Sequence, residues 1–252
     1  MKRYLAISLF ILTFIFTQNG FSQSNKLSFA LFGGYSLPTG DLKGDIHFNG
    51  TGDNTYLQKS GFNFGGAFKY ALDRTGALQL VVSVDYNGFS NSQDTTETTQ
   101  GKTPVTTTTT EKVKINILSA NVGAQYNFMP NHKVNPYVNL DFTNNFFSGS
   151  VDVSQSGTSV IAGTLKSAWR GGLQFGAGID FAVSPNIGVV VGGNYNLANL
   201  IGKDSAASTT SGEFSLMDKE HLEGSTTVAA RNISYLQLYA GISIYMNRKL
   251  LK

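Results

Sequence analysis

Apolar side chains recur at every second position in several stretches of this chain, which is the period of a β-strand with two unlike faces. The clearest stretch places Leu78, Leu80, Val82, Val84 and Tyr86 on one face, with mainly polar residues between them. The same alternation runs through residues 62–72, 173–181 and 236–246. No helical period appears beyond the N-terminal segment, so the pattern predicts an all-β fold.

Eight strands are predicted from these stretches. Their expected ranges are 27–37, 60–72, 76–89, 113–128, 134–147, 165–182, 186–198 and 232–247. The fourth strand changes phase between Ile117 and Leu118, which predicts a β-bulge at that point.

The connections between the predicted strands alternate in length. Short turns are expected at Asp73–Thr75, Met129–Lys133 and Val183–Pro185, and long loops at 38–59, 90–112, 148–164 and 199–231. An even number of antiparallel strands with this alternation is typical of an up-and-down transmembrane β-barrel, with short periplasmic turns and long extracellular loops. Both chain termini are then expected in the periplasm. The second long loop is rich in Thr, a β-forming residue, so it could extend two strands as a hairpin or form a mobile polar loop.

Composition separates a membrane barrel from a soluble one. Only 14% of residues are charged while 41% are hydrophobic, and the polar face of the strands carries Gly, Asn, Gln and Ser rather than Lys and Glu. Such a face suits a narrow interior, with the aliphatic face toward lipid. Because hydrocarbon offers no hydrogen-bond partners to open strand edges, the sheet must close on itself. A soluble barrel of the lipocalin kind would expose many more charges.

Aromatic residues fall near the predicted strand ends, where interfacial girdles are expected. One group is Tyr70, Tyr126, Phe128 and Phe181; the other is Tyr35, Phe62, Tyr86, Phe146, Trp169 and Tyr195.

The N-terminus predicts export. Lys2 and Arg3 precede an apolar run that is too short for a membrane helix, and Gly20 and Ser22 suit a cleavage site. We therefore expect a cleaved signal peptide at 1–22 and the barrel at 23–252. The chain has no cysteine, and its net charge of +3 gives no reason to expect nucleic acid as a partner.

Several segments resemble the small outer-membrane β-barrel family, which includes the OmpA/OmpX-like and PorT-like barrels. The first strand closes with Gly33–Gly34–Tyr35–Ser36–Leu37–Pro38–Thr39–Gly40–Asp41, a G-x-x-x-P-x-G-D ending common in that family; Pro136–Tyr137, Gly176–Asp180 and Leu238–Tyr245 resemble it too. The resemblance implies outer-membrane lipid and the barrel-assembly machinery as partners. The family usually ends at an aromatic residue, whereas here Tyr245 is followed by a seven-residue tail.

Charged residues at inward positions suggest how the lumen is closed. The predicted lumen charge network is Lys69, Asp85, Lys114, Asp141, Arg170 and Asp180. Charges inside a narrow barrel must be paired or hydrated, and an interior of eight strands is about filled by side chains. We therefore expect an interior salt-bridge network rather than a wide pore; separate hydrated charges are the alternative.

The predicted function is structural or surface-interacting, with an extracellular ligand or a membrane partner, and not enzymatic. Loop-mediated adhesion through 199–231 and a role in secretion or assembly are alternatives. A lipid A-modifying enzyme is a distant alternative, resting on His221 beside Glu220 and Glu223 with Ser215 and Ser225 nearby. Asp41, Asp45, Asp53 and Asp204 lie in loops without the spacing of a Ca²⁺ motif. No cofactor or metal site is predicted.

Overall fold

The structure is a computed structural model that describes residues 27–46, 55–99 and 105–246. Its principal strands, in chain order, are β1 (Leu27–Gly40), β2 (Ser60–Ala71), β3 (Leu78–Thr99), β4 (Val105–Asn127), β5 (Val134–Gln155), β6 (Thr158–Ala182), β7 (Ile187–Ile201) and β11 (Ile233–Met246). The predicted signal peptide and the end of the C-terminal tail lie outside the described residues. None of the described residues belongs to a helix that could span a membrane.

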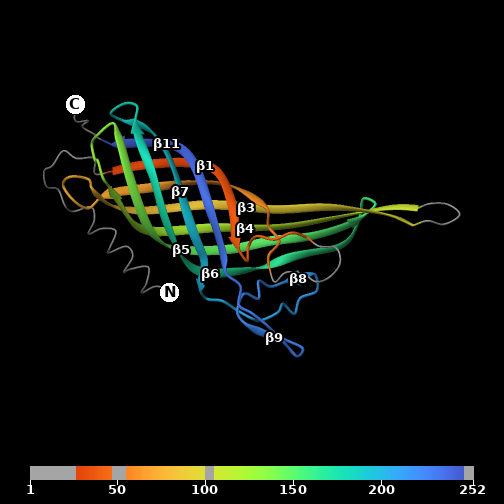
Figure 1. Ribbon diagram of the computed structural model, residues 1–252. Helices are drawn as coiled ribbons and strands as arrows, with labels where there is room; N and C mark the ends of the chain where they lie inside the picture. Colours follow the sequence, from red (N-terminus) through yellow and green to blue (C-terminus); the bar gives the residue numbers. More distant parts are fainter. Residues whose placement is uncertain (1–26, 47–54, 100–104, 247–252) are drawn as a thin grey trace.

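These eight strands form a closed antiparallel ring. Each pairs with its neighbours in the sequence, β7 pairs with β11, and β11 pairs with β1. Leu31 of β1, for example, lies opposite Gly66 of β2 on one side and Ile242 of β11 on the other. The predicted eight-stranded barrel is confirmed (Figure 1).

The outer surface of the ring is apolar, as the alternation predicts. Leu31, Phe64, Val84, Leu140 and Ile242 are among the many large apolar side chains exposed there. Aromatic rings mark two levels of this surface. Phe62 contacts Tyr86 toward the end with the long connections, which we call the long-loop end, and Tyr126 contacts Phe128 toward the opposite, short-turn end.

Two of the predicted long loops are strand extensions instead. Strand β3 continues past Ser90, its last position paired with β2, and remains paired with β4 as far as Thr99 opposite Val105. Residues 148–164 also continue β5 and β6, apart from a two-residue turn at Ser156 and Gly157, whose φ angles are +47° and +84°. Positive φ at both positions is the geometry of a type I′ hairpin turn. The hairpin alternative for the Thr-rich segment is thus correct, and the prediction of a loop at 148–164 is wrong.

Together, β3 to β6 form a projecting sheet that leaves the barrel at the long-loop end (Figure 1). The last connection lies beside this sheet and carries three short strands, β8 (Glu213–Phe214), β9 (His221–Glu223) and β10 (Thr226–Val228). Strand β8 pairs in parallel with Thr164 and Leu165 of β6, and β9 pairs with β10.

The predicted bulge between Ile117 and Leu118 is wrong. Strand β4 keeps its register with both β3 and β5 through this point. The register shifts occur instead where β6 pairs with β5 and where β6 pairs with β7. Ile115 and Ile117 point into the barrel and are buried, with 3% and 0% of their surface exposed. The apparent change of phase therefore marks a change in the interior, from polar to apolar, and not a slip of the backbone.

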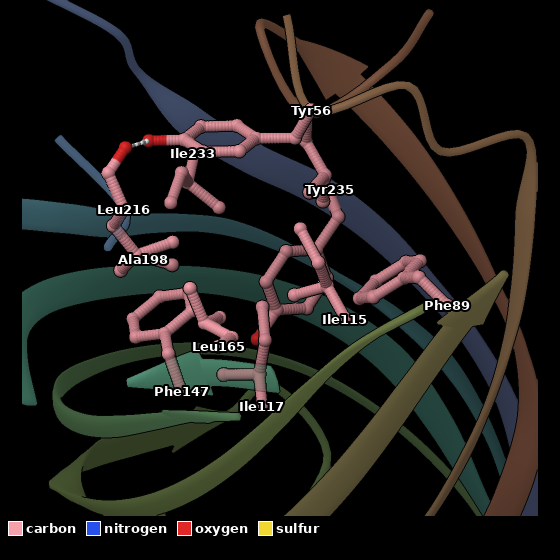
Figure 2. Packing of buried hydrophobic residues seen from close by; sticks show 11 residues of the cluster. Tyr56, Phe89, Ile115, Ile117, Phe147, Leu165, Ala198, Leu216, Ile233 and Tyr235 are labelled. Carbon is pink, nitrogen blue, oxygen red and sulfur yellow. Dashed lines mark hydrogen bonds between the residues drawn. The ribbon is translucent and has the colours of Figure 1, made fainter. Parts of the chain in front are cut away.

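The barrel interior has two zones. The lower zone, toward the short turns, is filled with amide and carboxylate side chains. The upper zone, toward the long loops, is an apolar cap built from barrel strands and from both large irregular connections (Figure 2). Its members are Leu42, Tyr56, Phe89, Ile115, Ile117, Phe147, Leu165, Ala198, Leu216, Ile233 and Tyr235.

Candidate functional site

The centre of the polar zone is the buried carboxylate of Asp85. It accepts hydrogen bonds from Asn87 (2.8 Å), Asn121 (2.6 Å) and Gln237 (2.8 Å), on β3, β4 and β11. Gln237 also donates to Asn87, and Ser36 of β1 does the same. A buried carboxylate needs such donors because burial removes its hydration. The arrangement links strands on opposite sides of the ring across the lumen.

The other predicted lumen charges below the cap are also buried and held by neutral groups. Asp141 accepts a hydrogen bond from Gln174 (3.1 Å), and Asp180 accepts one from the hydroxyl of Tyr245. The ammonium of Lys69 lies 4.9 Å from the centre of the Tyr137 ring. Two small cavities of about 40 and 30 Å³ lie beside these residues, each with room for about one water molecule.

Lys114 does not belong to this set. Its side chain is exposed, while its neighbour Ile115 is buried in the apolar cap. The inward placement of Lys114 depended on the predicted bulge, so the prediction is wrong for the same reason.

Arg170 is buried at the upper end of the lumen, and its partner comes from the last connection. Its Nε and Nη2 donate to the two oxygens of Asp218 at 2.9 and 2.6 Å. Asp218 also accepts from Asn199 (2.9 Å) and from the backbone N–H of Asp204 (3.1 Å). Burial alone would raise the pKa of Asp218, but the hydrogen bonds from Arg170, Asn199 and Asp204 hold it below its usual range.

Ion pairs therefore do not join the predicted charges to one another. Two salt bridges occur among the described residues: Arg170–Asp218 and the exposed pair Lys59–Asp45. Only Arg170 belongs to the predicted set, and sequence reasoning missed Asp218 because it lies in a segment without periodic pattern.

The apolar cap closes the barrel at the long-loop end. Tyr235, Phe89, Ile117 and Phe147 are at most 1% exposed. The hydroxyl of Tyr56, from the first long connection, donates to the carbonyl oxygen of Leu216 in the last connection at 2.9 Å (Figure 2). The two connections are thereby tied to each other above the mouth of the barrel.

The loop residues considered for chemistry are dispersed. Nδ1 of His221 lies 2.9 Å from the carbonyl oxygen of Lys219 on the edge of the β9–β10 hairpin, with Glu223 and Ser225 exposed nearby. Asp41 accepts from the backbone N–H of Asn232, and Asp204 from that of Ala206. No cluster of three or more His, Cys, Asp or Glu side chains suited to a metal ion occurs in the described part of the chain.

A closed antiparallel ring of eight strands, apolar outside, polar and filled inside, defines a transmembrane β-barrel, because only closure satisfies every backbone group in lipid. The sequence matches the outer membrane protein beta-barrel domain family over residues 8–219. The chain belongs to that family and is a small outer-membrane β-barrel protein.

Solved structures of similar fold include three small barrels. Neisserial surface protein A is 16% identical, with 87% of this chain and 97% of that chain covered and a TM-score of 0.47. Ail of Yersinia pestis, solved in complex with the heparin analogue sucrose octasulfate, is 13% identical, with 87% of this chain and 99% of that chain covered and a TM-score of 0.38. OprG of Pseudomonas aeruginosa is 12% identical, with 89% of this chain and 99% of that chain covered and a TM-score of 0.41. A sequence search of curated proteins gave no match.

Proposed function

We propose that this protein is a closed surface barrel that acts through its projecting end rather than through its lumen. In this proposal the long-loop end faces the cell exterior, the short turns and both termini face the periplasm, and residues 1–22 are removed on export. The contact surface for an extracellular ligand or a membrane partner is the projecting sheet together with the last connection.

The observation that carries the proposal is the length of the projecting sheet. Strand β3 continues for residues 91–99 beyond its pairing with β2. At about 3.3 Å per residue this adds about 30 Å to the strand. Between the barrel part of β3 and this extension, the outward positions change from Val84 and Tyr86 to Ser92, Asp94 and Thr96. A hairpin that contributes nothing to crossing the bilayer but keeps its strand pairing is suited to presenting a rigid surface.

The filled interior supports the same proposal, because it argues against a role for the lumen. We infer that Lys69, Asp85, Asp141, Arg170 and Asp180 keep the lumen closed through their hydrogen bonds, together with the apolar cap. A barrel with this interior is poorly suited to diffusion of solutes, which leaves its exposed end as the place where it can act. Charge reversal of Arg170 would place two carboxylates side by side and is expected to raise single-channel conductance or destabilise the barrel; no change in either would contradict the closed-lumen role.

Cysteine labelling tests the orientation, since the chain contains no native cysteine. Whole cells carrying Thr96→Cys or Thr75→Cys are treated with a membrane-impermeant maleimide. We expect labelling of the first variant, on the projecting sheet, and none of the second, in a short turn, until the cells are opened. The reverse pattern would overturn the proposal.

A shortened hairpin tests the contact surface. Residues 94–110 are replaced by Asn-Gly, so that Gln93 and Glu111, which lie opposite each other, flank a tight turn. Cells producing the intact or shortened protein are compared for retention on surfaces coated with polysaccharide or extracellular-matrix protein, and heat modifiability on a gel verifies that both barrels are folded. Loss of retention with a folded barrel supports the proposal, and equal retention on every surface that holds the intact protein contradicts it.

A further inference from the structure

A cavity of about 310 Å³ lies between the projecting sheet and the two irregular connections. Its lining residues include Thr55, Tyr56, Glu111, Val113, Leu216 and Arg231. Small-molecule sites typically span about 300–1,000 Å³, so this cavity lies at the lower end of that range. It is far larger than either of the water-sized spaces in the lumen.

The walls of the cavity are mostly hydrocarbon. One wall is the inner face of the projecting sheet, where Val113, Val151 and Val153 occupy alternate positions while the intervening residues are polar. Leu216 and Phe214, from the last connection, line it as well. An apolar concave surface of this kind favours the hydrocarbon part of a ligand, because burial removes both surfaces from water.

Two polar atoms of lining residues lack partners. Nε of Arg231 and Oγ1 of Thr55 are buried and have no hydrogen-bond partner among the described residues. Nη2 of Arg231 donates to the carbonyl oxygens of Leu216 at 2.5 Å and Met217 at 3.0 Å, and the guanidinium lies 4.3 Å from the centre of the Tyr56 ring. Because an unsatisfied buried donor costs free energy, a permanently charged one beside an apolar cavity indicates a missing acceptor.

We propose that this cavity binds a small amphipathic anion, with its hydrocarbon body against the valine wall and its acidic group accepting a hydrogen bond from Arg231. At about 30 Å³ for each water-sized group, the volume suits roughly ten non-hydrogen atoms, as in a medium-chain carboxylate. Glu111 and Ser215 also border the cavity. The negative charge of Glu111 opposes an anion, which makes its removal informative.

This inference goes beyond the role in surface contact, and it does not depend on which side of the membrane the projecting sheet faces. The experiment uses the full mature chain in phosphatidylcholine nanodiscs, which leave both ends of the barrel in contact with solution. Octanoate and its uncharged analogue octanamide are titrated by calorimetry at pH 7, and empty nanodiscs give the background.

We expect saturable binding of octanoate at one site, tighter than that of octanamide. Val113→Trp fills the cavity and should lower the affinity for octanoate at least about tenfold. The smaller change Val153→Phe should lower it by a similar factor. The matched control is Lys112→Trp, because Lys112 adjoins Val113 but is exposed; it should leave affinity unchanged.

Charge variants test the recognition of the anion. Arg231→Gln should remove the preference for octanoate over octanamide, since the charge-assisted hydrogen bond is lost. Glu111→Gln should strengthen octanoate binding and leave octanamide unaffected. Binding that is absent, that does not saturate, or that is equal in the intact protein and Val113→Trp would overturn the proposal and leave the cavity as a site for water.

Discussion

Breaking the buried pair between Arg170 and Asp218 should release the last connection from the barrel. The perturbation is Asp218→Ala, which removes the acceptor of two bonds from Arg170, one from Asn199 and one from the backbone of Asp204. The Arg170 and Asp218 side chains are 7% and 0% exposed, so the guanidinium would remain buried without its partner.

The expected cost follows from that burial. Removing one member of a buried ion pair typically costs about 3–5 kcal/mol, because the remaining charge is uncompensated. We expect the last connection to detach from the barrel and let water reach Arg170. The lost free energy then favours this local opening rather than unfolding of the ring. Since 1.4 kcal/mol is a factor of ten, about 3 kcal/mol raises the open population roughly 100-fold.

Native-state proteolysis measures this opening. Lys203, Lys219 and Arg231 are trypsin sites within the last connection. When opening is fast relative to cleavage, the cleavage rate follows the open population, so Asp218→Ala should be cleaved there roughly 100-fold faster. The urea midpoint of the barrel itself should change little.

The double variant Arg170→Met/Asp218→Leu is the control. It removes both charges and keeps apolar volume, which should restore most of the protection because no buried charge is left unpaired. Cleavage of Asp218→Ala at the wild-type rate, or equal cleavage of the single and double variants, would refute the reasoning.

Three further predictions concern pH, ring closure and the cap. The hydrogen bonds that lower the pKa of Asp218 stabilise the docked connection at any pH above 3.8, the ordinary pKa of an aspartate. This stabilisation is lost as the pH falls through the lower pKa that Asp218 has in the folded protein. Pepsin should therefore cleave the connection progressively faster as the buffer is acidified below pH 4. Gly241→Val should prevent closure of the ring and abolish heat modifiability, because a Cβ there would lie 2.1 Å from the carbonyl oxygen of Leu31. The ring of Gly66→Ala should still close, because its Cβ would lie 3.3 Å from the flexible end of the Leu31 side chain and 3.5 Å from the carbonyl oxygen of Ala30, an ordinary contact distance. Phe147→Ala should lower the free energy of unfolding in urea by about 3–5 kcal/mol, the usual cost of removing a buried aromatic ring, and an unchanged midpoint would show that the cap adds nothing to stability.

The errors of sequence interpretation share one physical origin. The period-2 signal depends on two faces in unlike surroundings, and a bilayer outside with a polar lumen inside supplies that contrast. Beyond the bilayer the two faces of a strand no longer meet such different surroundings, so the sequence pattern predicts a loop at 148–164, where the structure has strands. Within the barrel, the contrast disappears at Ile115 and Ile117, where the interior becomes apolar. The sequence pattern there predicts a bulge, and the bulge in turn predicts an inward position for Lys114, which is wrong.

The sequence by itself determined the all-β class, the number of ring strands, the short turns and the outward position of the aliphatic side chains, because hydrocarbon imposes these features locally, residue by residue. Only the tertiary structure decided what caps the barrel and which buried groups pair with one another. Asp218 meets Arg170 from 48 positions away along the chain, and Tyr56 meets Leu216 from 160. Such contacts depend on how irregular segments fold back over the mouth of the ring, and no periodic pattern records that path.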